Sequence, residues 1–297
     1  MKISNRLYLL LFIVGCFIPL QVSAADETPS HVFQLASDLE NQIMAIRKDA
    51  KIRSKVSKPP VQTNKLPVHV YSKAIELNEK IIRLQQKFNL PTAEQKTIPV
   101  RDITPTDVFQ IVQFLNEELG KVMEAKGLQF EHAAFVDNKT PSSTYEKMME
   151  VSLEMDDLIG PIDPNQVFRN SEIIDAEFDL IANKMGVKFP DRKVPLDKTA
   201  SPYDSTIEGF MNLYKIAKLE RKLGIPAVRV SDFPVGKITP TEVYDMTNNI
   251  LAELVRIKAK LGITDPASTP KLLEGKKPYE VHQLMVKVGR KIDALAQ

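Results

Sequence analysis

Eight proline-led segments recur along the chain at nearly constant spacing, and this repetition constrains the fold more than any other feature of the sequence. The gaps between successive prolines are 38, 38, 36, 23, 38, 38 and 38 residues. Fixed periods of roughly 20 to 50 residues indicate repeated supersecondary units. The prolines that open the segments are Pro29, Pro67, Pro105, Pro141, Pro164, Pro202, Pro240 and Pro278.

The segments also repeat at a longer period, which spans four of the short repeats. Adding 135 to the numbers of the first three prolines gives the fifth, sixth and seventh, and adding 137 to the fourth gives the eighth. This pattern predicts an internal duplication of a four-segment unit. We place the first unit at 25–161 and the second at 162–297, with the segment 1–24 preceding both.

Each segment has the features of an α-helix start. Proline is favoured at the first helical position because its missing N–H would have no helical acceptor there. The heptapeptides ITPTDVF (103–109) and ITPTEVY (238–244) have the spacing of a capping box. The predicted N-caps are Thr28, Thr104, Thr140, Asp163, Ser201 and Thr239.

Apolar residues within the segments recur at intervals of three, four and seven, as in helices that pack into bundles. We therefore predict an all-α fold of eight proline-initiated helices, arranged as two tandem four-helix units. A single elongated array of helical pairs is the alternative. The connectors, such as 91–103 and 226–238, are long enough to return along a helix as extended straps.

Two methionines and three small or polar residues stand on the predicted helix seams. Met148 and Met155 are expected in the core, where methionine fills irregular space, rather than as copper(I) ligands. Gly209, Ser171 and Thr247 occupy seam positions that carry larger side chains in other segments. They leave either room for a ligand or a site of close helix approach, and we favour close approach.

The N-terminal segment 1–24 has the three parts of a secretion signal. Two basic residues precede an apolar run over 7–20, and a small-x-small site ends at Ala24. We expect cleavage after Ala24 and a periplasmic mature chain, since no later segment is apolar enough to span a membrane. In the alternative, Cys16 of a lipobox-like IVGC sequence carries a lipid that anchors the protein.

Sequence motifs for catalysis, metals and cofactors are missing. The four histidines lack zinc-ligand spacing, and no P-loop, dinucleotide or G-x-S-x-G motif occurs. His31 and His69 are expected to be exposed in first helical turns. The acidic groups at 117–118 and within 150–157 are expected on solvated helix faces. We predict that the protein is not an enzyme and has no metal or cofactor.

The first connector and the helix end before it form the most strongly charged part of the chain. A solvated linker is one interpretation, and contact with an anionic partner such as lipid headgroups is the other. The net charge of only +2 and the lack of interleaved aromatic residues disfavour nucleic acid. The candidate contact residues are Arg47, Lys48, Lys51, Arg53, Lys55, Lys58 and Lys65.

These features favour a non-enzymatic, extracytoplasmic binding or scaffold protein that acts in the bacterial cell envelope through contacts with a protein partner. A duplicated scaffold presents two similar surfaces, which suits bivalent binding. The alternative is a periplasmic small-molecule-binding or sensor-like bundle, because helical bundles can hold ligands between their helices.

Overall fold

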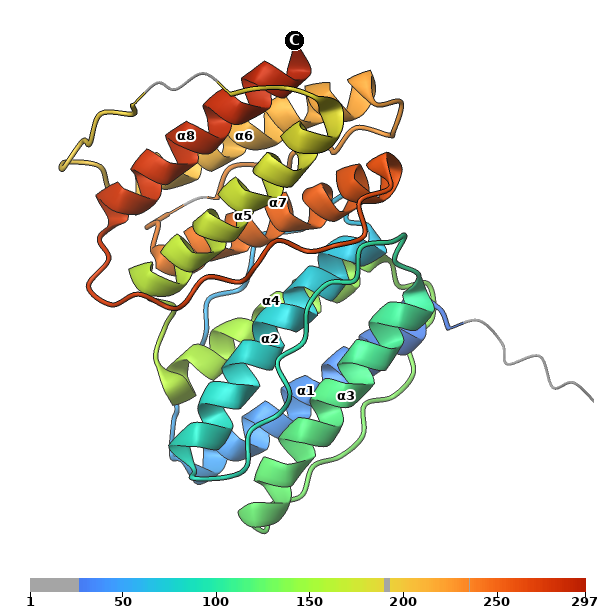
Figure 1. Cartoon of the computed structure of the whole chain (residues 1–297). Helices are drawn as coiled ribbons and strands as arrows, with labels where there is room; N and C mark the ends of the chain where they lie inside the picture. Colours follow the sequence, from blue (N-terminus) through green and yellow to red (C-terminus); the bar gives the residue numbers. More distant parts are fainter. Residues whose placement is uncertain (1–26, 190–192, 235) are drawn as a thin grey trace, which may run out of the picture.

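The computed structural model describes residues 27–189, 193–234 and 236–297, and these residues confirm the all-α fold. They form eight helices and no strands (Figure 1). None of the described helices is long and apolar enough to cross a membrane. The predicted secretion signal and Cys16 lie outside the described residues. The helices are α1 (Pro29–Asp49), α2 (Pro67–Lys87), α3 (Pro105–Ala125), α4 (Pro141–Ile159), α5 (Pro164–Met185), α6 (Pro202–Lys222), α7 (Pro240–Leu261) and α8 (Pro278–Ala296).

The helices pack as two bundles of four. In the first bundle α1 and α2 each pack against α3 and α4, and in the second α5 and α6 each pack against α7 and α8. The bundles meet where α2 packs against α7, in the middle of the molecule in Figure 1. Two tandem bundles are therefore observed in place of the elongated array, and their matching helix order is consistent with an internal duplication.

Local capping explains where the helices begin. All eight start at the predicted prolines, and the six predicted N-caps stand directly before them. At α3 the Thr104 N–H donates to Asp107 Oδ2 over 2.8 Å, and the Asp107 N–H donates to Thr104 Oγ1 over 3.3 Å. At α7 the Thr239 N–H donates to Glu242 Oε2 over 2.7 Å. The repeated heptapeptide is a helix-start sequence because these bonds satisfy N–H groups that lack helical acceptors.

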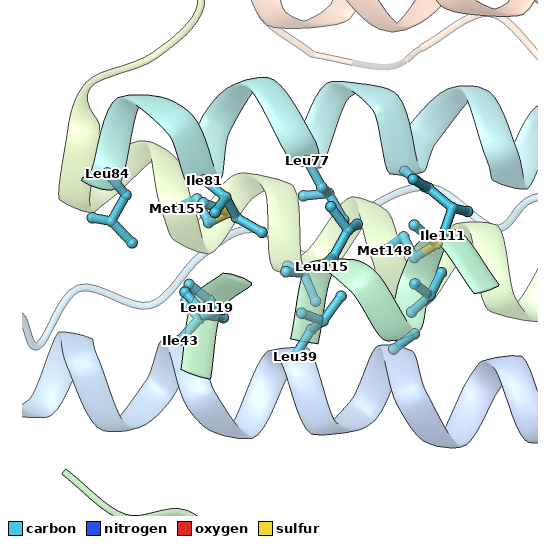
Figure 2. Packing of buried hydrophobic residues seen from close by; sticks show 14 of the residues in the cluster. Leu39, Ile43, Leu77, Ile81, Leu84, Ile111, Leu115, Leu119, Met148 and Met155 are labelled. Atoms are coloured by element: carbon cyan, nitrogen blue, oxygen red, sulfur yellow. The ribbon is translucent and has the colours of Figure 1, made fainter. Parts of the chain in front are cut away.

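Each bundle encloses its own apolar core. In the first bundle Leu39, Leu77 and Leu115 come from three different helices and face one another across the bundle axis (Figure 2). Met148 and Met155 of α4 are buried in this core, which confirms their predicted packing role.

Ion pairs at matching positions also relate the two bundles. In the first bundle Lys80 Nζ of α2 lies 2.5 Å from Asp156 Oδ1 of α4. In the second bundle Lys215 Nζ of α6 lies 2.8 Å from Asp293 Oδ2 of α8. The two lysines differ by 135 in residue number and the two aspartates by 137, as do the prolines that start their helices. The repeat thus extends from the helix starts to individual side-chain contacts.

Gly209 is a point of close approach between α6 and α7. A Cβ at this position would lie 1.9 Å from Met246 Sδ. The seam position therefore brings helices together, as we expected, and holds no space for a ligand.

Replacing Gly209 by alanine is expected to destabilise the protein, because Met246 must move and overpacking typically costs about 1–3 kcal/mol. Gly120→Ala is the matched control in α3, since a Cβ there meets nothing within 4 Å. This control should stabilise the protein by up to about 1 kcal/mol through helix propensity. Urea denaturation measures both changes, and equal effects of the two substitutions would contradict the close approach.

Candidate ligand-binding cleft between the two bundles

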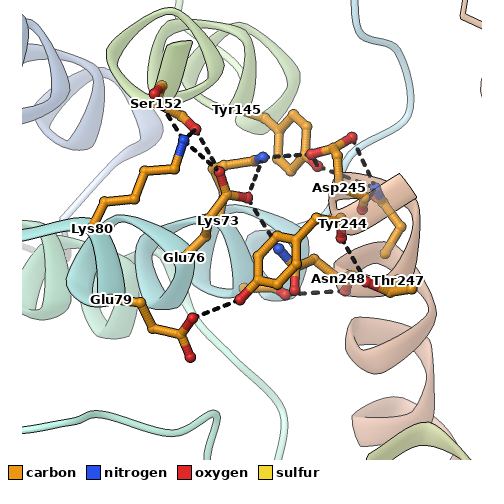
Figure 3. Close-up of polar contacts among 12 residues, drawn as sticks. Lys73, Glu76, Glu79, Lys80, Tyr145, Ser152, Tyr244, Asp245, Thr247 and Asn248 are labelled. Carbon is orange, nitrogen blue, oxygen red and sulfur yellow. Dashed lines mark hydrogen bonds and ion pairs between the residues drawn. The ribbon is translucent and has the colours of Figure 1, made fainter. Parts of the chain in front are cut away.

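A buried polar network joins the bundles where α2 meets α7 (Figure 3). Lys73 Nζ of α2 lies 2.6 Å from Glu76 Oε2 in the same helix and 2.5 Å from Asp245 Oδ1 of α7. Burial alone would lower the pKa of Lys73, but Asp245 and Glu76 outweigh burial and raise this pKa well above its ordinary value. Lys73 therefore stays charged and holds the two helices together.

Neighbouring side chains complete the network. Tyr145 Oη of α4 donates to Asp245 Oδ1 over 2.7 Å, and Asn248 Nδ2 of α7 donates to Glu76 Oε2 over 3.0 Å. Burial alone would raise the pKa of Asp245, but Lys73 outweighs burial and the pKa is lowered. Both carboxylates thus remain ionised beside the charged Lys73, and Lys80 Nζ, which lies 3.7 Å from Glu76 Oε1, supplies a second positive charge.

A second buried cluster joins α2, α6 and α7. His69 Nδ1 accepts a backbone N–H at the start of α2 over 3.0 Å, so its Nε2–H donates to Glu253 Oε1 of α7 over 2.7 Å. Arg256 pairs with Glu253 and also lies 2.9 Å from Glu220 Oε1 of α6. The other oxygen of Glu220 accepts the Val228 N–H over 2.6 Å. The cluster therefore also anchors the connector between α6 and α7.

Glu220 is the protonated member of this cluster. Burial is the largest cause that raises its pKa to about 9, and the adjacent Glu253 raises it further. Burial alone would also raise the pKa of Glu253, but bonds from His69 and Glu220 outweigh burial and lower it. In the first bundle the residue that matches Glu220 is Gln85, whose Nε2 donates to Glu118 Oε2 over 3.0 Å. Protonated Glu220 is, like this amide, a neutral donor.

A cleft with a volume of about 840 Å³ opens beside both clusters. One wall is the connector between α1 and α2, and another is the connector between α6 and α7. The helices α2, α4, α6 and α7, together with Pro161 of the connector between α4 and α5, supply the rest of the described lining. Lys73 and Asp245 of the polar network and His69 of the second cluster face this space. The cleft exists only because the two bundles meet, and neither bundle forms it alone.

Five cations line the cleft without forming an ion pair to any carboxylate that the structure describes. Three come from the first connector and two from the connector between α6 and α7. They are Lys55, Lys58, Lys65, Arg229 and Lys237. Cations gathered from two walls of one cleft attract anions more strongly than the same charges spread over a surface.

Lys65 is the most deeply placed of these cations. Its Nζ donates to Asn249 Oδ1 over 2.7 Å and lies 4.5 Å from the centre of the Tyr145 ring. Burial is the largest cause that lowers the pKa of Lys65 to about 8, and the neighbouring Lys73 lowers it further, while Asp245 opposes both. Asp245 compensates the positive charge of Lys65 only in part, and an anion bound beside Nζ would supply the remaining negative charge.

The seven basic residues predicted as anion contacts take different positions. Arg47 is buried, and its Nη1 lies 2.7 Å from Asp157 Oδ2, so it holds α1 to α4. Lys48, Lys51 and Arg53 are exposed and do not line the cleft. The structure brings together Lys55, Lys58 and Lys65 on one wall of the cleft.

Several residues expected on the surface are buried instead. His69 is 3% exposed because it bonds across the bundle interface, and Glu118 is 7% exposed because it accepts from Gln85. Asp156 pairs with a fully buried lysine of the neighbouring helix. Our expectation of solvated positions was wrong for these three residues, of which Asp156 is only partly buried, since the sequence does not show which helix faces pack against other helices.

Sequence reasoning missed Arg229 and Lys237 of the cleft. They stand singly in a connector of mixed composition, and no motif or local charge excess marks them. Only the facing basic connector, which lies far earlier in the chain, gives them a shared role.

The described parts of the chain hold no group of three or more His, Cys, Asp or Glu side chains suited to a metal ion. Comparison of the chain with protein-family models, curated proteins and solved structures finds no match. The geometry and the charge of the cleft are therefore the features of this protein that bear on its function.

Proposed function

We propose that this protein is a non-enzymatic binding protein of the bacterial cell envelope whose inter-bundle cleft holds a small organic anion. The five cleft cations without carboxylate partners carry this proposal. A volume of about 840 Å³ suits a small organic ligand, since such pockets usually measure roughly 300–1,000 Å³. The cleft thus favours the small-molecule alternative over binding of a protein partner at this site.

The carboxylates in the described lining do not cancel these cations. Asp245 pairs with Lys73, and the two aspartates contributed by α4 pair with Lys80 and Arg47. Glu242 accepts the hydrogen bonds that cap α7. Asp232 and Glu242 remain as two acidic groups opposite five basic ones, so the cleft favours a negatively charged ligand.

Apolar side chains line another part of the cleft and indicate what the body of the ligand is like. Two methionines, two leucines and one phenylalanine face the same space as the cations. A carboxylate or phosphate with an attached apolar body would satisfy both parts. The apolar residues are Met149, Leu153, Phe210, Leu213 and Met246.

Calorimetric titration with decanoate tests this proposal, with 1-decanol as the uncharged ligand of the same chain length. We expect decanoate to bind more tightly, because only the carboxylate meets the cleft cations. Lys65→Met should weaken decanoate binding by about ten-fold or more, since a charged hydrogen bond contributes roughly 1.5–3 kcal/mol. Lys51→Met is the control, because Lys51 is exposed and lies off the cleft.

The affinity for decanoate should also depend on pH. Lys65 is protonated below its pKa of about 8, and only this form attracts the carboxylate. Affinity should therefore be nearly constant between the carboxyl pKa of decanoate, roughly 4–5, and about pH 7, and fall as the pH rises through 8, whereas Lys65→Met should remove the fall at high pH. Equal binding of decanoate and decanol, or unchanged decanoate binding by Lys65→Met, would overturn the proposal.

A further inference from the structure

Helix α6 carries a stripe of exposed apolar side chains. Tyr203, Ile207, Met211 and Tyr214 are 51%, 41%, 51% and 57% exposed. Their spacing of four, four and three places them on one face of the helix. None of the four lines the cleft, so the stripe is separate from the proposed ligand site.

Two half-buried aromatic residues support one edge of the stripe. The Tyr203 and Phe233 ring centres are 5.6 Å apart, and those of Phe210 and Phe233 are 5.1 Å apart. The exposed side chains therefore stand on a packed helix with a packed connector beside it. Contiguous exposed apolar surface on such a scaffold marks an interaction site.

The internal repeat shows what this helix face does in the first bundle. The residues at the matching positions of the repeat are Val68, Ser72, Glu76 and Glu79 of α2. Each of them contacts α7 of the second bundle, through apolar packing for Val68 and through hydrogen bonds for the other three. This face of the repeated unit is thus a helix-docking face, and on α6 no described segment covers it.

We propose that the α6 face binds the α6 face of a second copy of this chain, forming a two-fold symmetric dimer of antiparallel helices. A two-fold interface requires a surface that is complementary to itself. With Met211 on the symmetry axis, the antiparallel register places Ile207 within one residue of the position opposite Tyr214 of the second copy, so that the two side chains lie close together. The same register places Asp204 near Lys218 of the second copy, so opposite charges meet at both ends of the apolar stripe.

The position of α6 in the molecule leaves room for this contact. The helices α6 and α8 lie at the end of the molecule opposite α1 and α3 (Figure 1). Lys218 is exposed and has no carboxylate partner in the part of the chain that the structure describes. A single pair of helices forms a small interface, so we expect a dimer with a dissociation constant in the micromolar range.

Sedimentation velocity over a range of micromolar concentrations tests the dimer. The chain should shift from monomer to dimer as concentration rises, and Met211→Glu should leave it monomeric because two carboxylates would meet on the axis. Met44→Glu is the control, since Met44 is 48% exposed on α1 and lies away from α6. The thermal melting of the Met211→Glu variant should be unchanged, which separates loss of the dimer from loss of the fold.

Cysteine cross-linking supplies the second measurement. In a chain that carries Cys16→Ser, Met211→Cys should form a covalent dimer faster than Met44→Cys under mild oxidation. Equal rates, a monomer at every concentration, or a dimer that survives Met211→Glu would each overturn the proposal. Binding of the monomer to vesicles that Met211→Glu abolishes would instead assign this face to a lipid surface.

Discussion

Replacing Glu253 by glutamine is expected to destabilise the protein by about 3–5 kcal/mol, whereas the same change at Glu220 should cost less than about 1 kcal/mol. The two side chains are both fully buried and both contact Arg256. A difference between them therefore reports which carboxyl group carries the negative charge.

The large effect at Glu253 follows from its partners. Its carboxylate accepts from His69 of α2 and pairs with Arg256 of α7, so it joins the two bundles. Glutamine would leave Arg256, whose side chain is 15% exposed, without the negative charge of its fully buried partner, and removing one partner of a buried ion pair usually costs several kcal/mol.

The small effect at Glu220 follows from its raised pKa. With a pKa of about 9, Glu220 is neutral at pH 7, and glutamine has nearly the same size and shape. Gln85 already occupies the matching position in the first bundle and bonds both Glu118 and a connector N–H. Glutamine at 220 can make the same two bonds.

Urea denaturation at pH 7 measures both free energies of unfolding. Between about pH 4.5 and 9 the wild-type protein should lose stability progressively as the pH rises, and the loss should level off above pH 9, while Glu220→Gln should not show this loss. The folded pKa of Glu220 is raised, so its contribution to stability is fully present below about pH 4.5 and is lost as the pH rises from there to the folded pKa of about 9. Equal destabilisation by the two substitutions at pH 7 would show that both groups are charged.

Replacing Lys73 by methionine is the second change expected to have a large effect, of about 3–5 kcal/mol. Lys73 is 2% exposed and forms ion pairs with both Glu76 and Asp245 between the bundles. Its loss would leave the buried Glu76 and the partly buried Asp245 with less positive charge beside them. Lys73→Met combined with Asp245→Asn should be less destabilised than Lys73→Met, because the pair is removed together.

The same double variant should respond less to acid than the wild type. The pKa of Asp245 is lowered in the folded protein, so its ionised form contributes stability above the ordinary carboxyl pKa, and this contribution is lost as the pH falls through the folded pKa. Denaturation at pH 7 and at pH 3 measures the difference. The proposed coupling would be contradicted by two results together. The free-energy changes of the two single substitutions would add up in the double variant, and the double variant would lose as much stability in acid as the wild type.

The sequence alone was sufficient to predict the helices, and it indicated two units of four while leaving an elongated array open as the alternative. The signals for a helix are local: proline at the first helical position, a capping residue before it and apolar residues at bundle spacing. Local signals can be read from the sequence without knowing the tertiary structure. The long period of the repeat also predicted two equal sets of four helices, because matching residues in a repeat have matching environments.

The cleft could be predicted only in part. Lys55, Lys58 and Lys65 stood out as a local excess of charge, whereas Arg229 and Lys237 joined them only once the connectors faced each other. The burial of His69 depended on which helix of the second bundle met α2.

The amino-acid sequence by itself determined the eight helices, their caps and the two repeated units. The tertiary structure decided which outer helix faces became interfaces, which charges were buried, and where the cleft lies. The physical reason is the distance along the sequence over which each interaction acts. Caps and helix periodicity act over a few neighbouring residues, whereas ion pairs such as Lys73–Asp245 join distant parts of the chain whose meeting depends on how whole bundles dock.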